Sequence, residues 1–138
     1  AESRRRAEGA LAEVDLLPAK DRRIGAYSKG MRQRVKLAQA IAHEPEVLLL
    51  DEPVSGMDPV NRRRVVDLVK RLGREGKTVV VSSHLLAEVE RTCTHVVVMH
   101  RGELVAAGPL DQVVAADSAD TAPADLETVF LGLIGASS

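Results

Sequence analysis

The chain has 138 residues, a net charge of -1, 45% apolar and 28% charged residues, which is ordinary for a globular domain with a real core. The near-neutral charge and the single Tyr and Phe give no electrostatic or base-stacking argument for a nucleic-acid partner. One cysteine excludes an internal disulfide, and no apolar run approaches the ~20 residues of a membrane span. Because the chain begins without Met inside a helical pattern, we expect it to be part of a longer protein.

Helical periodicity dominates the first 45 residues. Apolar spacing predicts a helix over 3–17, followed by a polar connection over 18–30 that contains glycine. A second apolar stripe starts at Met31 and predicts a helix that ends before Pro45.

Two short apolar runs, Val47–Leu50 and Thr78–Val81, predict strands. Both are continuously apolar, so we expect both to be covered on both faces. Between them, Asp58 and Pro59 predict the N-cap and first residue of a helix that glycines close.

The remaining residues predict smaller elements, and the alternation of strands with helices predicts an α/β fold with a parallel sheet. In chain order they are a helix over 85–93, a hairpin over 95–107 that turns at Arg101–Gly102, a short helix over 109–115, a linker over 116–124 and an amphipathic helix over 126–134.

Two strand ends carry the candidate chemistry. Asp51 and Glu52 follow the first strand in VLLLDEP, and His84 closes the Ser-Ser-His run after the second. Ligands of parallel sheets sit beyond the carboxyl ends of the strands, so we expect these groups at one edge. Nucleotide-hydrolysing enzymes hold magnesium beside the phosphates with such an aspartate, and Glu52 would then polarise the attacking water. Either carboxylate alone is commonly only a turn cap, whereas the pair followed by PVSGMDP favours a site.

A magnesium–nucleotide site also needs a phosphate loop, and this chain has no match to its GxxxxGK[ST] pattern. GREGKT, which begins at Gly73, has the wrong glycine spacing and runs from helix to strand rather than from strand to helix. We interpret its glycines as helix-stop and turn residues.

A second anion site is predicted at the start of the second helix, in YSKGM. Ser28, Lys29 and Gly30 place a hydroxyl, a cation and an open backbone where free N–H groups favour phosphate. Taken alone, Ser28 could equally be an ordinary helix cap.

Together these motifs resemble those of an ABC-type ATPase. YSKGMRQRVKLAQAIAHEPEVLLLDEPVSGMDP is similar to the signature motif, signature helix, Walker B strand and D-loop of that family, and His84 lies where the family has its switch histidine. The resemblance covers nearly the whole chain, and the tail LETVFL resembles the C-terminal helix of drug-resistance-type exporters.

The resemblance implies a role for each motif residue. Glu52 would be the general base or water polariser, and His84 would contact the γ-phosphate. Asp51 would order Mg²⁺, mostly through water. Ser28, Lys29 and Gly30 would bind the ATP held mainly by a partner subunit, and Asp58 would belong to the loop that links the two sites. The histidines at 43, 95 and 100 match no motif.

The resemblance also implies a fold and an assembly. The fold would be part of a RecA-like P-loop NTPase sheet with flanking helices, plus the end of the helical subdomain: residues 1–45 in the helical subdomain, 46–116 in the ATPase core and 117–138 as linker and C-terminal helix. The expected partners are a second ATPase subunit, identical or not, and a membrane permease subunit. The expected location is cytoplasmic, at the inner face of the cell membrane.

The chain departs from the common LSGGQ signature, because Tyr27, Lys29 and Met31 replace Leu, Gly and Gln. The hydroxyl and the last glycine are kept, so phosphate contact is still expected. The family's phosphate loop, adenine-stacking aromatic and Q-loop glutamine would all precede residue 1, so we expect the chain alone to be inactive.

The resemblance favours one hypothesis for the function: the C-terminal part of the ATP-hydrolysing subunit of an ABC transporter, which drives export through a separate membrane subunit. Two alternatives stay open. One is a non-transport ABC-type ATPase, although the long coiled-coil insertion or second ATPase copy of such proteins is not seen in this sequence. The other is a non-catalytic truncated interaction module. An in-frame phosphate loop encoded upstream would favour the enzyme, and a start codon near Ala1 would favour the module.

Overall fold

The computed structural model describes residues 1–116 and 125–136, so the predicted linker lies outside the described residues except for Ala116. The chain divides into two compact units, Ala1–His84 and Leu85–Ser138. All of the predicted site residues belong to the first unit.

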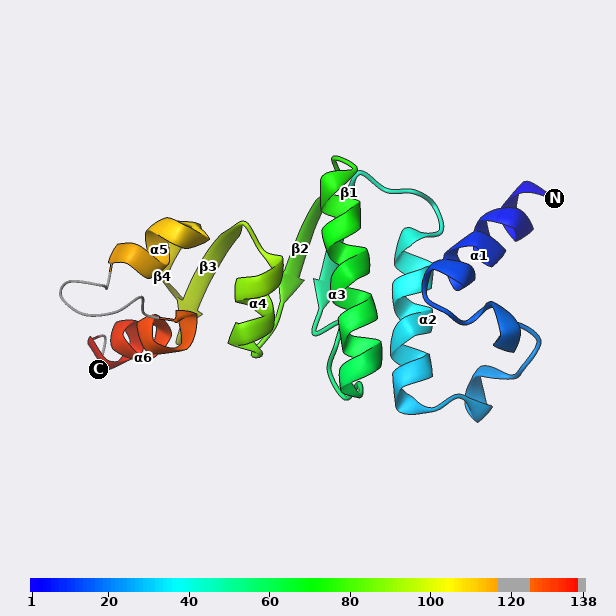
Figure 1. Cartoon of the computed structure of the whole chain (residues 1–138), viewed down its shortest axis with the longest axis horizontal. Helices are drawn as coiled ribbons and strands as arrows, with labels where there is room; N and C mark the ends of the chain where they lie inside the picture. Colours follow the sequence, from blue (N-terminus) through cyan, green and yellow to red (C-terminus); the bar gives the residue numbers. More distant parts are fainter. Residues whose placement is uncertain (117–124, 137–138) are drawn as a thin grey trace. The chain divides into compact units, whose positions relative to one another are not determined.

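The first unit combines helices with a two-stranded parallel sheet (Figure 1). Strands β1 (Val47–Asp51) and β2 (Thr78–Ser82) pair with Asp51 opposite Ser82. Helix α3 (Pro59–Arg74) packs against β2, and α2 (Lys29–Ile41) packs against β1 and against α1 (Glu2–Glu13). Two 3-10 turns, η1 (Leu17–Ala19) and η2 (Ile24–Ala26), connect α1 to α2.

The first helix is shorter than its predicted span of 3–17. It ends at Glu13 because Asp15 takes a left-handed conformation with φ of 60°, which a continuing α-helix does not allow. The chain then turns, and Val14 and Leu16 are buried on either side of Asp15.

The start of α3 confirms its predicted cap. Asp58 Oδ1 accepts from the backbone N–H groups of Val60 and Asn61, both at 3.0 Å, and Pro59 is the first helical residue. The predicted apolar stripe is buried; it consists of Val65, Leu68, Val69 and Leu72.

The segment after α3 confirms Gly76 as a turn residue, but the predicted helix stop at Gly73 is wrong, because Gly73 lies inside α3. The helix runs to Arg74, and Gly76 has a φ of 89° that favours glycine. Lys77 Nζ donates to the Pro45 carbonyl at 2.8 Å, so this lysine ties the starts of the two strands together.

The prediction that both strands are covered on both faces is wrong for the described residues. Leu48 and Leu50 are buried, whereas Leu49 between them is 76% exposed. On β2, Val80 is exposed and its two valine neighbours are half-buried. In the described part of the chain, helices, chiefly α3, cover only one face of this sheet. Side chains on the other face are therefore exposed.

In the described residues of the second unit there are an antiparallel hairpin and three helices. The hairpin pairs β3 (His95–His100) with β4 (Glu103–Pro109), and its Arg101–Gly102 turn has both residues at positive φ, as predicted. The helices are α4 (Leu86–Thr92), α5 (Leu110–Ala116) and α6 (Leu126–Ala136).

Packing in the second unit is aliphatic. Val96 and Val98 of the hairpin and Leu126 and Val129 of α6 are buried. Burial also raises the pKa of the Cys93 thiol, which favours its protonated form.

Candidate functional site

The carboxyl ends of β1 and β2 meet, and four polar side chains gather there. The Ser82 hydroxyl donates to Asp51 Oδ1 across the strand pair. Glu52 Oε1 lies 3.1 Å from the His84 backbone nitrogen, which donates to it, and 2.8 Å from His84 Nδ1. The structure therefore brings Asp51, Glu52 and His84 to one edge, as the strand-end argument predicts.

Glu52 is held in an unusual backbone conformation. Its φ is 46°, in the left-handed region that non-glycine residues rarely occupy. Its N–H donates to the carbonyl oxygen and to the hydroxyl oxygen of Ser82, each at 3.1 Å. Its carbonyl accepts from Gln33 Nε2 at 2.9 Å and from the Ser55 N–H at 3.1 Å. All these contacts fix the direction in which the side chain leaves the turn.

The two carboxylate oxygens of Glu52 differ. His84 occupies Oε1, whereas Oε2 is buried and has no hydrogen-bond partner among the described residues. A buried carboxylate oxygen without a partner is costly, so a proton donor or water is expected to meet it in the working site.

The carboxylate of Asp51 fits a magnesium ion better than it fits a transition metal. No group of three or more His, Cys, Asp or Glu side chains is placed to hold a metal in residues 1–116 and 125–136. Magnesium takes one or two protein carboxylates and completes its shell with water and phosphate, which the exposed Asp51 at a strand end allows.

The first turn of α2 is open at the predicted anion site. Ser28 Oγ accepts from the Met31 N–H at 3.2 Å, so Ser28 is a helix cap, and its own hydroxyl proton remains available to a ligand. A Cβ placed on Gly30 would meet nothing within 4 Å, which leaves this backbone accessible. The helix-cap and phosphate-contact interpretations of Ser28 are therefore compatible.

Tyr27, which replaces the leucine of the common signature, is a core residue. It is 5% exposed, and its hydroxyl donates to the Ala19 carbonyl at 2.6 Å. Arg32 donates from Nη1 to the Tyr27 carbonyl at 2.5 Å. The substitution thus anchors the connection before α2 rather than reaching a ligand.

Lys29 lies against the loop that follows β1. A Cβ placed on Gly56 would fall 2.6 Å from Lys29 Cε and 2.8 Å from its Nζ. Gly56 has a φ of 70°, so its backbone conformation favours glycine there.

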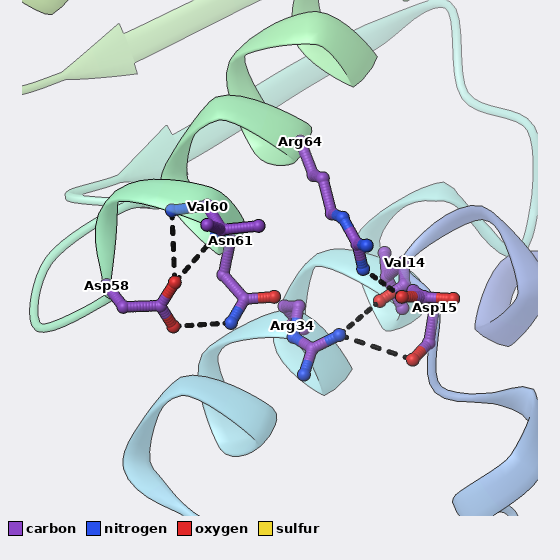
Figure 2. A network of polar contacts seen from close by, with 7 residues as sticks. All are labelled: Val14, Asp15, Arg34, Asp58, Val60, Asn61 and Arg64. Carbon is purple, nitrogen blue, oxygen red and sulfur yellow. Dashed lines mark hydrogen bonds and ion pairs between the residues drawn. The ribbon is translucent and has the colours of Figure 1, made fainter.

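Asp58 is used in capping, as Figure 2 shows. Besides the two backbone donors of α3, the Asn61 side chain donates to its Oδ2. The Asn61 backbone, the Asn61 side chain and the Val60 backbone together hold the pKa of Asp58 below its ordinary value.

Figure 2 also shows how the residues after α1 are joined to α2 and α3. Arg34 of α2 donates from Nη1 to the carbonyls of Val14 at 3.0 Å and Asp15 at 3.2 Å. Arg64 of α3 forms an ion pair with the Asp15 carboxylate. The end of α1 is therefore tied to both α2 and α3.

A cavity of about 540 Å³ lies away from these groups, at the amino end of β1. Leu48, Leu72, Arg71 and Lys77 are among its lining residues, and none of the predicted site residues is. It has no evident connection to the strand-end chemistry.

Gln33 had no predicted role, although its spacing in the sequence could have identified it. It lies four residues after Lys29 and four before the buried Leu37, so the three residues share one face of α2. A polar residue within such a stripe is a candidate contact to a buried backbone group.

No helix in the described part of the chain combines the length and the apolar character required to cross a bilayer. A family model described as ABC transporter matches residues 2–55. This match includes the start of α2, β1 and the two strand-end carboxylates.

Two curated relatives show how far the similarity extends. An uncharacterized ABC transporter ATP-binding protein of Synechocystis is 44% identical over 112 residues, which are 78% of this chain and 32% of the relative. The bacitracin transport ATP-binding protein BcrA of Enterococcus faecalis is 43% identical over 71% of this chain and 32% of its own length.

The fold is shared with solved structures. The ATP-binding subunit of an ABC transporter superposes with a TM-score of 0.79 at 30% identity, over 97% of this chain and 55% of the solved one. The chain therefore has the RecA-like α/β fold of those domains, and it spans about a third of the length of the two curated relatives. These matches place the chain in the family of ABC transporter ATP-binding domains.

Proposed function

We propose that this chain supplies the C-terminal part of the ATP-hydrolysing subunit of an ABC transporter, which drives export through a separate membrane subunit. The observation that carries the proposal is the meeting of two strand ends, where His84 holds one oxygen of Glu52 and leaves Oε2 unpartnered. The name of BcrA, which refers to bacitracin transport, supports a role in transport.

In this proposal Glu52 polarises the water that attacks the γ-phosphate of ATP. His84 fixes the carboxylate through Oε1 and contacts the γ-phosphate with its ring. The Ser82 hydroxyl orients Asp51, which would hold Mg²⁺. When bound, the ion would neutralise charge on the phosphate oxygens.

The complete site would need a second ATPase subunit and further sequence. Ser28, Lys29 and Gly30 would face the ATP of a second ATPase subunit, and Asp58 would lie in the loop between the two sites. A phosphate loop and an adenine-stacking residue would come from sequence outside these 138 residues. Within the chain, residues 1–45 would form the end of the helical subdomain, residues 46–116 the C-terminal part of the ATPase core, and residues 117–138 the linker and C-terminal helix. The whole would sit at the cytoplasmic face of the membrane beside its permease.

The test compares the complete ATP-binding subunit that contains this chain with its Glu52→Gln variant. Glutamine keeps the shape but cannot act as a base, so we expect phosphate release to fall about 10²- to 10⁴-fold while ATP binding persists. Malachite-green detection of phosphate and equilibrium binding of a fluorescent ATP analogue measure the two effects. Unchanged turnover would remove Glu52 from the mechanism.

A second arm uses the 138-residue chain alone. Without the phosphate cradle and its lysine, it is expected to show neither micromolar ATP binding by calorimetry nor hydrolysis. Saturable micromolar binding would show that the chain holds nucleotide by groups other than those assigned.

A further inference from the structure

Two polar side chains on one face of α2 contact the segment that follows β1. Gln33 Nε2 donates to the Glu52 carbonyl at 2.9 Å, and the end of Lys29 lies over Gly56. Residues four apart on a helix share a face, so these are neighbouring contacts of one surface. The first two turns of α2 therefore meet residues 52–56 at two points, and at one of them Gln33 binds the segment through a hydrogen bond.

The contact from Gln33 acts on a strained residue. Glu52 has a φ of 46° and stays in that conformation only because its surroundings fix it. The bond from the Ser55 N–H to the same carbonyl is local and closes the turn. The bond from Gln33 differs in kind, because it joins the turn to a helix nineteen residues away in sequence.

The same helix begins at the predicted contact to the partner's ATP. Ser28 precedes Gln33 by five residues, which is about 7.5 Å of helix. A helical segment this short moves as a rigid body, so a displacement at Ser28 reaches Gln33.

We propose that Gln33 is a positioning residue. Because it donates a hydrogen bond to the Glu52 carbonyl, the orientation of the Glu52 carboxylate depends on the position of α2. The inference rests on the proposed ATPase function and adds to it a route by which nucleotide at one site affects catalysis at the other. Gln33 itself contacts neither phosphate nor water in this scheme.

The experiment uses the complete ATP-binding subunit and a Gln33→Met variant, which keeps the length of the side chain and removes the donor. We expect kcat to fall roughly threefold to tenfold, the effect of one lost hydrogen bond, with KM and the thermal midpoint near those of the wild type. Gln39→Met is the matched control, since Gln39 is an exposed glutamine of the same helix. It should leave kcat unchanged.

A double-mutant cycle separates positioning from general stability. If Gln33 acts through Glu52, Gln33→Met should have no further effect on the residual hydrolysis of the Glu52→Gln subunit. An equal loss in both backgrounds, or an unchanged kcat in the single variant, would overturn the proposal. If the wild type does not hydrolyse ATP, or Glu52→Gln matches it, the proposed function itself has failed.

A second variant covers the case in which methionine disturbs folding. Gln33→Glu keeps the size of the side chain but presents a carboxylate oxygen to the Glu52 carbonyl, so its kcat should fall at least as far. If neither variant folds, Gln33 serves stability rather than positioning, and the proposal is wrong.

Discussion

Glu52 and Asp15 occupy similar turns but differ in what their side chains can do. Glu52 directly follows β1, and Asp15 lies two residues after the end of α1. Each is a non-glycine residue at positive φ, at 46° and 60°, and each has its carbonyl bound by a side chain of α2. The Asp15 side chain is 62% exposed and paired with Arg64. The Glu52 side chain is 33% exposed, and its Oε2 is buried without a partner in the described residues.

The comparison teaches that backbone strain alone does not identify a functional residue. Both turns persist because neighbouring helices bind them, and at Asp15 the result is only a connection between three helices. At Glu52 the same kind of support accompanies a carboxylate oxygen that has no partner among the described residues. The available chemistry of the side chain makes the difference.

Replacing each residue by glycine is the strongest test of this comparison. Glycine removes the left-handed cost of about 1–2 kcal/mol at either turn. Glu52→Gly should nevertheless lower ATP hydrolysis by the complete subunit about 100-fold or more, because the polarising carboxylate is gone. Asp15→Gly should leave hydrolysis unchanged and stability within about 1 kcal/mol of the wild type, since an exposed ion pair contributes little.

Steady-state phosphate release and chemical unfolding of the same preparations measure both effects. Asp15→Ala is the control, because it loses the ion pair and keeps the strain; it should be less stable than Asp15→Gly. A large loss of hydrolysis in Asp15→Gly would mean that the two turns do not differ as described.

Gly56→Ala sharpens the comparison within the loop that follows Glu52. Its φ of 70° would cost alanine about 1–2 kcal/mol of stability, measured by chemical unfolding. The collision with Lys29 adds little, because the far end of a lysine can move aside. Lys29→Ala in the same chain should therefore recover only a small part of the loss, and full recovery would show that the collision dominates.

The smallest expected effect concerns Asp58 and pH. Hydrogen bonds from Asn61 and Val60 lower its pKa in the folded protein, so its contribution to stability is complete above the unfolded pKa. That contribution is lost as the pH falls through the lowered folded value. Asp58→Asn keeps a capping side chain that does not titrate, so the wild type should lose slightly more stability than Asp58→Asn between neutral pH and about pH 3.

Thermal unfolding across that pH range measures the difference between the two proteins. Parallel curves would show that Asp58 does not titrate differently in the folded and unfolded states. In that case the capping bonds would not lower its pKa.

Sequence reasoning located the elements well where local signals agree. The Asp58–Pro59 start of α3, its buried stripe and the Arg101–Gly102 turn are all confirmed, because a cap, a helical period and a glycine turn are local properties. It was wrong about the end of α1, because the left-handed turn at Asp15 is fixed by arginines from other helices. It was wrong about coverage of the sheet, because exposure of Leu49 depends on which elements are present to pack on it.

Residue order and spacing are enough to show that two carboxylates end one strand, that a histidine follows the next, and that a hydroxyl and a glycine open a helix, because these are local properties of the chain. Three contacts depend on packing: His84 occupies Oε1 of Glu52, Ser82 donates to Asp51, and Gln33 binds the turn after β1. These contacts join residues far apart in sequence, so they arise only when parallel strands and a packed helix bring their side chains within hydrogen-bond distance.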